Sequence, residues 1–208
     1  MTAKFPGEKY STAGAFLADY ASAMAKALNS VRPAELERAV TAMKRAIQAD
    51  RMIFTCGNGG SAAIANHLTC DCSKGIASNT TLRPRVVSLS STVELITAIA
   101  NDMAFPEIFA YQLKNAARPG DVLITISSSG DSENIIRALD WAGENGMTTI
   151  AMSGFSGGRS AQMADISLHV AAANYGVVED VHQSLMHILA QYVRMSELPS
   201  ELVQTLRF

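Results

Sequence analysis

Short apolar segments, each followed by a polar loop and a helix-forming stretch, are the feature that most constrains this 208-residue chain. The clearest unit is Arg51–Cys72, where the apolar run Met52–Thr55 predicts a buried strand and a glycine-rich loop leads into an alanine-rich helix. Further strands are predicted at residues 85–89, 121–126, 147–152 and 166–170. This alternation is typical of βαβ units. We therefore expect an α/β fold: a three-layer αβα sandwich, flavodoxin-like or Rossmann-like, with a mostly parallel sheet.

The first 50 residues have a different pattern. Apolar residues recur there at helical spacing over about residues 11–49, with an interruption near Pro33, which suits the first turn of a second helix. Each helix has an apolar stripe that must pack on the core or on another subunit. We expect an N-terminal helical arm at residues 1–50 that serves oligomerisation, followed by the α/β domain at residues 51–208.

Composition and charge weigh against several classes of protein. The formal net charge is −2 and no run of Lys and Arg occurs, so we expect no direct nucleic-acid partner. No apolar stretch reaches the roughly 20 residues that span a bilayer, and the N-terminus lacks the apolar segment of a signal peptide. The three cysteines do not suggest a disulfide framework. We expect a cytoplasmic protein without membrane association.

Polar loops follow the predicted strands at residues 57–61, 90–92, 127–132 and 153–158. Because ligands bind at the carboxyl ends of parallel strands, these loops are expected to converge on one edge, although each alone would also serve as a helix cap. The loop Ser127–Ser132 offers several hydroxyls and backbone N–H groups at a helix start, which suits a phosphate group. Neither a P-loop motif nor the G-x-G-x-x-G fingerprint is present, so a sugar phosphate fits better than a nucleotide.

The helix after the first loop carries His67 and Asp71, four residues apart on one face. They form a candidate metal or acid–base pair. His67 with Cys70 is an alternative ligand pair.

The segments GNGGSAAIANH and SSSGDSEN, together with a last predicted helix that carries Glu179 and His187, resemble the sugar isomerase (SIS) domain family. Within it they are most similar to the bacterial phosphoheptose isomerases, over nearly the whole chain. The resemblance implies an enzyme, an aldose–ketose isomerase that converts sedoheptulose 7-phosphate to D-glycero-D-manno-heptose 7-phosphate for lipopolysaccharide heptose synthesis. It also implies one zinc ion per subunit and a homotetramer whose sites lie at subunit interfaces.

The resemblance also assigns roles to individual residues. The substrate contacts it implies are Asn58, Gly59, Gly60, Ser61, Asn101, Asp102, Ser127, Ser128, Ser129, Ser132 and Glu179. The metal ligands it implies are His67, Asp71, Glu179 and His187, and the catalytic residues are Asp71, His187 and Glu179. Two positions depart from the family, which usually has Glu at position 71 and Gln at position 179.

An aldose–ketose isomerisation needs a base near one carbon, a proton donor near the oxygen and a positive partner for the developing charge. Asp71 or Glu179 is expected to be the base and His187 the acid. Glu179, Gln183 and His187 lie along one face of the last predicted helix, so two histidines and two carboxylates could surround zinc. His182 lies off that face, and His169 lies in a predicted strand, so structural roles are expected for both.

Two alternatives remain open from the sequence. A non-catalytic SIS protein could bind a partner such as the replication initiator DnaA or sense sugar phosphates. The second alternative is an isomerase that acts on a different sugar phosphate, in which Glu179, in place of the family's Gln, reflects a different reaction chemistry.

Overall fold

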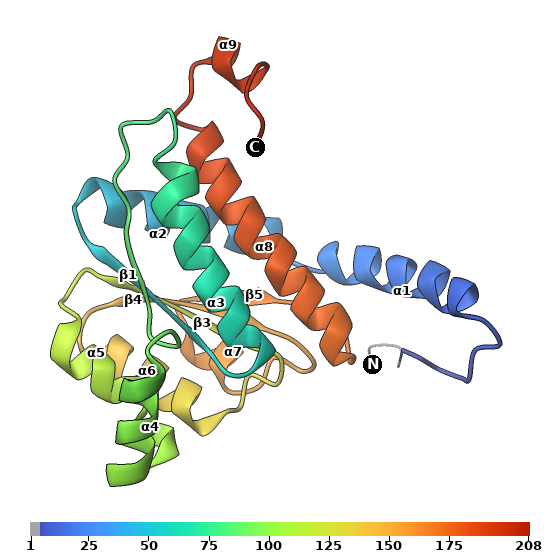
Figure 1. The fold of residues 1–208 in the computed structure, drawn as a ribbon, viewed down its shortest axis with the longest axis horizontal. Coiled ribbons are helices and arrows are strands. Elements are labelled where there is room, and N and C mark those ends of the chain that lie inside the picture. The colour runs from blue at the N-terminus through green and yellow to red at the C-terminus, as the bar shows by residue number, and fades with distance from the viewer. Residues whose placement is uncertain (1–4) are drawn as a thin grey trace.

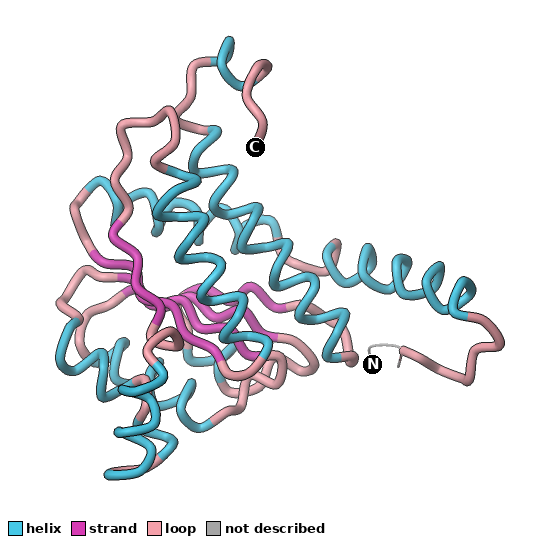
Figure 2. Tube along the Cα trace, viewed as in Figure 1, coloured by secondary structure: helices cyan, strands magenta, loops and turns pink. Residues whose placement is uncertain are grey.

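The computed structural model describes residues 5–208, and a five-stranded parallel sheet with the order β2-β1-β3-β4-β5 forms its centre (Figures 1 and 2). Its strands are β1 (Met52–Gly57), β2 (Arg85–Ser88), β3 (Val122–Ser127), β4 (Thr148–Ser153) and β5 (Ile166–His169). These match the predicted strands to within two residues, and all pairings are parallel. The expected α/β fold is confirmed.

Helices cover both faces of the sheet, as Figure 1 shows. The helices are α1 (Ala13–Leu28), α2 (Pro33–Gln48), α3 (Gly60–Cys70), the π-helix η1 (Asp71–Ile76), α4 (Val93–Asp102), the 3₁₀-helix η2 (Phe105–Glu107), α5 (Ala110–Ala116), α6 (Glu133–Glu144), α7 (Ser160–Met163), α8 (Tyr175–Met195) and α9 (Ser200–Val203). One face packs against α2, α3 and α8, and the other packs against α4, α5 and α6.

The central strand β3 is buried along its whole length because helices cover it on both sides. Its side chains alternate between the two cores: Ile124 belongs to the core under α3 and α8, and Leu123 to the core under α5 and α6. Apolar burial of this kind is the main stabilising contribution to such a fold.

The two N-terminal helices differ in their surroundings. Helix α1 projects from the body and leaves Leu17 68% exposed, although Tyr20 donates a hydrogen bond of 2.6 Å to Asp180 on α8. Helix α2 contributes Val40 and Met43 to the same core as α8. The division into an arm and a main domain at residue 50 stays a prediction.

Two further observations bear on the sequence analysis. Cys56, Cys70 and Cys72 are all free thiols. Among the helices within residues 5–208, none is both long enough and apolar enough to cross a membrane.

Candidate active site

The loop between β1 and α3 approaches α8 closely at its glycines. Gly59 adopts φ +52°, a left-handed conformation that favours glycine. A Cβ atom at Gly60 would lie 2.5 Å from Oε2 of Glu179, so only glycine allows this carboxylate to approach the start of α3. The glycine-rich loop therefore leaves room for the Glu179 carboxylate, a relationship that the sequence alone did not indicate.

The serine loop between β3 and α6 lies next to this first loop. A small cavity of about 160 Å³ lies between the two loops and α8; its lining residues are Asn58, Ser61, Ile126, Ser127, Ser128, Ser129, Ser132, Tyr175 and Glu179. Two side-chain hydrogen bonds of 2.9 Å join Asn58 to Asn134 and hold the loops together. The predicted convergence of these two loops is thus present. Asn134 and Tyr175 are site residues to which the sequence reasoning gave no role, although Asn134 ends the SSSGDSEN segment.

The serine loop has its own internal restraints. Ser127 Oγ accepts a hydrogen bond of 3.1 Å from the N–H of Gly130. Arg159 donates from its backbone N–H and from Nε to Asp131, at 3.0 and 3.1 Å, and these bonds lower the pKa of that carboxyl group. In contrast, the buried Ser128 Oγ has no hydrogen-bond partner among the described residues. Its hydrogen-bonding capacity is therefore unused within the described residues.

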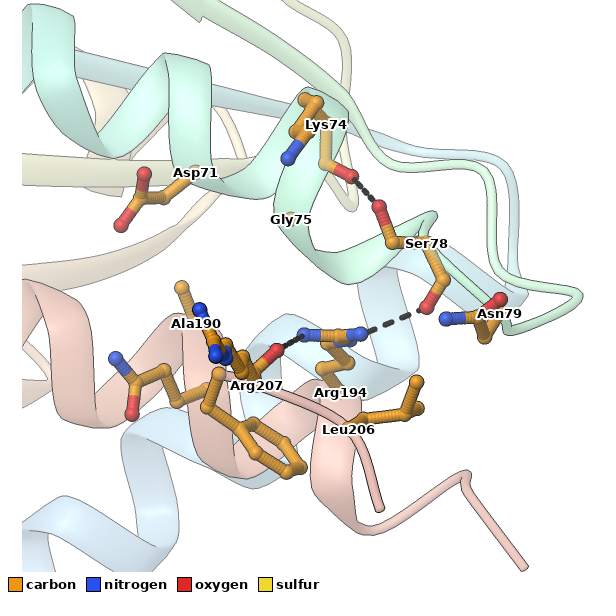
Figure 3. A pocket seen from close by; sticks show the side chains of 11 residues that line it. Asp71, Lys74, Gly75, Ser78, Asn79, Ala190, Arg194, Leu206 and Arg207 are labelled. Carbon is orange, nitrogen blue, oxygen red and sulfur yellow. Dashed lines mark hydrogen bonds between the residues drawn. The ribbon is translucent and has the colours of Figure 1, made fainter. Parts of the chain in front are cut away.

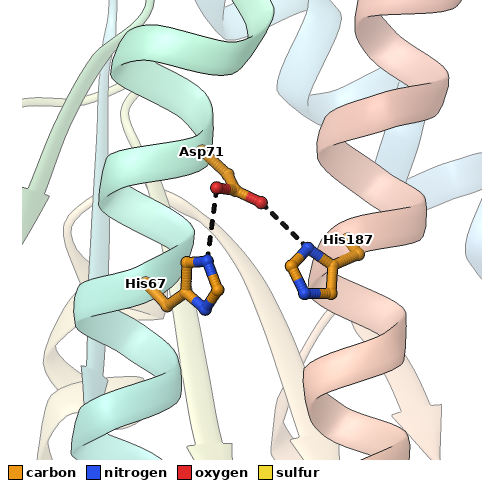
Figure 4. A group of neighbouring side chains, drawn as sticks. All are labelled: His67, Asp71 and His187. Carbon is orange, nitrogen blue, oxygen red and sulfur yellow. Dashed lines mark hydrogen bonds and ion pairs between the residues drawn. The ribbon is translucent and has the colours of Figure 1, made fainter. Parts of the chain in front are cut away.

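A second group of polar side chains lies between α3 and α8 (Figure 4). His67 Nε2 lies 3.4 Å from Asp71 Oδ1, and His187 Nδ1 lies 2.9 Å from Asp71 Oδ2. Ligand atoms of these three residues all lie within 4.8 Å of one another. Two imidazoles and a carboxylate are donors that zinc prefers, so the residues present fit such an ion.

Gln183 on α8 lies between the two histidines. Its Nε2 is 2.7 Å from Nδ1 of His67 and 3.1 Å from Nε2 of His187. The sequence placed Gln183 on the same helix face as His187 but gave it no role.

The predicted fourth ligand, Glu179, lies apart from this group. Its carboxylate faces Gly60 and the serine-loop cavity, and the three-residue group does not include it. Its place among the metal ligands stays a prediction. Cys70, the alternative ligand, is exposed and is likewise outside the group.

Asn101 and Asp102 end helix α4 and are exposed. Asn101 donates a 2.8 Å hydrogen bond to Asp102, and neither lines the serine-loop cavity. Their predicted contact with substrate is not tested by this arrangement.

The two histidines expected to be structural lie away from the His67–His187 cluster. His182 is fully buried, and burial lowers its pKa to about 4, so the ring is neutral at physiological pH. His169 contacts the carbonyl oxygen of Phe155 through Nε2, at 3.0 Å.

A larger cavity of about 450 Å³ opens on the other side of Asp71, between η1, the end of α8 and the C-terminal segment (Figure 3). Three cationic side chains line it: Lys74, Arg194 and Arg207. Arg194 donates to the carbonyl oxygens of Ser78 and Arg207, at 3.1 and 3.3 Å. These bonds fasten the C-terminal segment to the body.

The fold and this site define a class of protein. A family model described as "SIS domain" matches residues 17–154, about two thirds of the chain, and the chain belongs to this family.

Relatives within the family identify the type of enzyme. A phosphoheptose isomerase of Halorhodospira halophila is 36% identical over 170 residues, covering 80% of this chain and 85% of the relative. One of Mycobacterium tuberculosis is 36% identical over 148 residues, covering 70% and 74%. The solved structure of phosphoheptose isomerase GmhA from Neisseria gonorrhoeae has a TM-score of 0.80 at 31% identity, covering 88% of this chain and 96% of that one. The chain is an isomerase.

Proposed function

We propose that this enzyme is a phosphosugar aldose–ketose isomerase that converts sedoheptulose 7-phosphate to D-glycero-D-manno-heptose 7-phosphate. The observation that supports the proposal is the position of Glu179. It lines the serine-loop cavity, and it lies one helical turn from Gln183, which contacts both His67 and His187. The proposed phosphate site and the proposed acid–base site therefore lie next to each other along helix α8. The named relatives support this substrate class.

The serine loop is the proposed phosphate site. Ser128, Ser129 and Ser132 line one cavity, and Ser132 is the residue that precedes helix α6. A helix N-terminus and hydroxyl donors stabilise a phosphate without a lysine. The phosphate fixes one end of the sugar, and the remaining chain then extends toward Glu179. Asn58, Gly59, Gly60 and Ser61 are the proposed contacts for its hydroxyl groups.

His67, Asp71 and His187 are the proposed holders of one zinc ion per subunit. When bound, the ion supplies Lewis acidity toward the carbonyl oxygen of the sugar. The hydrogen bonds of Asp71 to both rings hold the imidazoles in place, as carboxylates commonly do beside metal-binding histidines.

The reaction moves one proton between carbons and one between oxygens. We assign the carbon proton to Glu179, whose carboxylate faces the cavity, whereas both oxygens of Asp71 already face histidines. Glu179 takes the proton from C1 of the ketose and returns it to C2. One proton is added to the C2 oxygen and one leaves the C1 hydroxyl, and we assign this exchange to solvent water, because Nδ1 of His187 is held by Asp71 and its Nε2 faces the metal position. No atom is gained or lost.

A homotetramer in the cytoplasm is also part of the proposal. The exposed apolar residues of α1, Phe16 and Leu17, suit a subunit contact. Light scattering would then give about four times the 22.1 kDa chain mass. The alternative of a non-catalytic partner-binding protein is not favoured, since the relatives named above are isomerases.

Turnover tests the proposal. Purified protein, loaded with zinc or stripped by a chelator, is incubated with sedoheptulose 7-phosphate and other ketose phosphates. The zinc-loaded protein should produce an aldose 7-phosphate. If no ketose phosphate yields product while bound zinc is confirmed, the proposed function is wrong.

A further inference from the structure

Gln183 lies between His67 and His187, the two histidines of the proposed metal site. Its amide nitrogen lies 2.7 Å from Nδ1 of His67 and 3.1 Å from Nε2 of His187. An amide NH₂ group has two hydrogens to donate and accepts no hydrogen bond. Both ring nitrogens that face it therefore act as acceptors.

The remaining ring nitrogens complete a consistent network. A neutral imidazole carries its proton on one nitrogen only. His67 then carries it on Nε2 and His187 on Nδ1, and these are the atoms that face Asp71 at 3.4 and 2.9 Å. Asp71 accepts a hydrogen bond from each ring and Gln183 donates one to each ring, so all four ring nitrogens have a partner of the right kind.

This network leaves one lone pair on each ring directed at the same amide group. An ion held by these two nitrogens needs those lone pairs, so it must take the place of the Gln183 N–H bonds. Rotation of the amide by about half a turn exchanges its NH₂ group for Oε1, an oxygen with two lone pairs. Gln183 thereby changes from hydrogen-bond donor to oxygen ligand without leaving its half-buried position on α8.

Glu179 is less suited to bind the same ion. It lies one turn earlier on α8, and its carboxylate is packed against the start of α3, where a Cβ at Gly60 would be 2.5 Å from Oε2 and 3.0 Å from Oε1. This position turns the carboxylate toward the serine-loop cavity.

We propose that Gln183, and not Glu179, joins Nδ1 of His67 and Nε2 of His187 as a ligand of a divalent cation such as zinc, while Asp71 holds both rings through their other nitrogens. Glu179 is then free to act on the sugar. The inference rests on the metal site of the proposed function, but it concerns only which residue of α8 joins the two histidines as a ligand.

Zinc affinity of the full-length protein tests the inference without any activity assay. Competition with a chromophoric chelator gives the dissociation constant, and elemental analysis gives the stoichiometry. Gln183→Leu should weaken zinc binding by about 10- to 100-fold or more, because even residues that only support ligands contribute this much. Gln183→Glu, which keeps an oxygen donor, should retain zinc. Glu179→Gln should stay within about threefold of the parent protein.

Two outcomes would overturn the inference: Gln183→Leu binds zinc as tightly as the parent, or Glu179→Gln loses as much affinity as Gln183→Leu. If the parent protein itself binds no zinc, the metal site of the proposed function fails, and the inference fails with it. Circular dichroism confirms that each variant folds. If Gln183→Leu does not fold, Gln183→Met, of similar length, takes its place.

The metal-free protein gives a second readout. Long-range ¹⁵N–¹H spectra should show His67 protonated at Nε2 and His187 at Nδ1. The opposite tautomer at either ring would contradict the donor role of Gln183.

Discussion

His187 Nδ1 lies 2.9 Å from Oδ2 of Asp71, although 116 residues separate them in the chain. The contact joins the start of the π-helix η1 to α8, and the same carboxylate faces His67 through its other oxygen. One aspartate therefore orients both histidines of the proposed metal site.

Asp71→Asn tests this role. An amide presents one acceptor oxygen where the carboxylate presents two, so one histidine loses its partner. We expect zinc affinity to fall by about 10- to 100-fold and turnover to fall with it. Glu144→Gln is the control, because it removes one negative charge in the same way at an exposed position on α6. Unchanged zinc affinity in Asp71→Asn would contradict the role of Asp71.

Substitutions in the serine loop should separate ligand binding from loop stability. Ser128 Oγ is buried without a partner in the described part of the chain, so Ser128→Ala should raise KM for the sugar phosphate with little change in unfolding free energy. Ser127→Ala removes the acceptor of the Gly130 N–H and should cost about 0.5–1.5 kcal/mol of stability. Steady-state kinetics and urea unfolding of both variants check the contrast. Equal KM values for Ser128→Ala and the parent would count against a phosphate at this loop.

The sequence predicted the fold well because each strand is a local apolar run, and the parallel order then places the loops after β1 and β3 at one edge. The pair of His67 and Asp71 follows from helical spacing, but the approach of His187 depends on packing between α3 and α8. Residue spacing cannot give that approach, and the family resemblance supplied it. Three further features arise only in three dimensions: the closeness of Glu179 to Gly60, the bridge made by Gln183, and the basic cavity closed by the C-terminal segment.

Acid stability should depend on Glu35. Burial by itself raises the pKa of this carboxyl group, but the N–H of Ser167 and the guanidinium group of Arg38 outweigh burial and hold the pKa below its usual 4.5. A lowered pKa contributes stability at neutral pH that is lost as pH falls through the folded-state value.

Glu35→Gln should therefore lower the unfolding free energy at pH 7 by about 1.5–3 kcal/mol, the range for hydrogen bonds to charged groups. The difference from the parent should shrink below pH 4.5. Glu37→Gln, exposed on the same helix, is the control. Denaturant unfolding across pH 3 to 7 measures both, and a difference that does not change with pH would refute the assignment.

The C-terminal segment should depend on Arg194. This side chain is 9% exposed, donates to the carbonyl oxygens of Ser78 and Arg207, and lies 4.9 Å from the ring centroid of Phe208. Arg194→Met should cost about 1.5–3 kcal/mol and expose the segment to proteolysis. Arg45→Met, an exposed change on α2, should have little effect. Limited proteolysis with mass spectrometry checks the result, and equal protection in Arg194→Met would show that other contacts hold the segment.

The central claim is that the site between α3 and α8 catalyses an isomerisation in which Glu179 transfers a proton between two carbons of the sugar. The most direct measurement is NMR of zinc-loaded protein with sedoheptulose 7-phosphate in D₂O. The account predicts an aldose 7-phosphate that carries deuterium at C2, because the proton held by Glu179 exchanges with solvent before it returns. Absence of any aldose phosphate would contradict it.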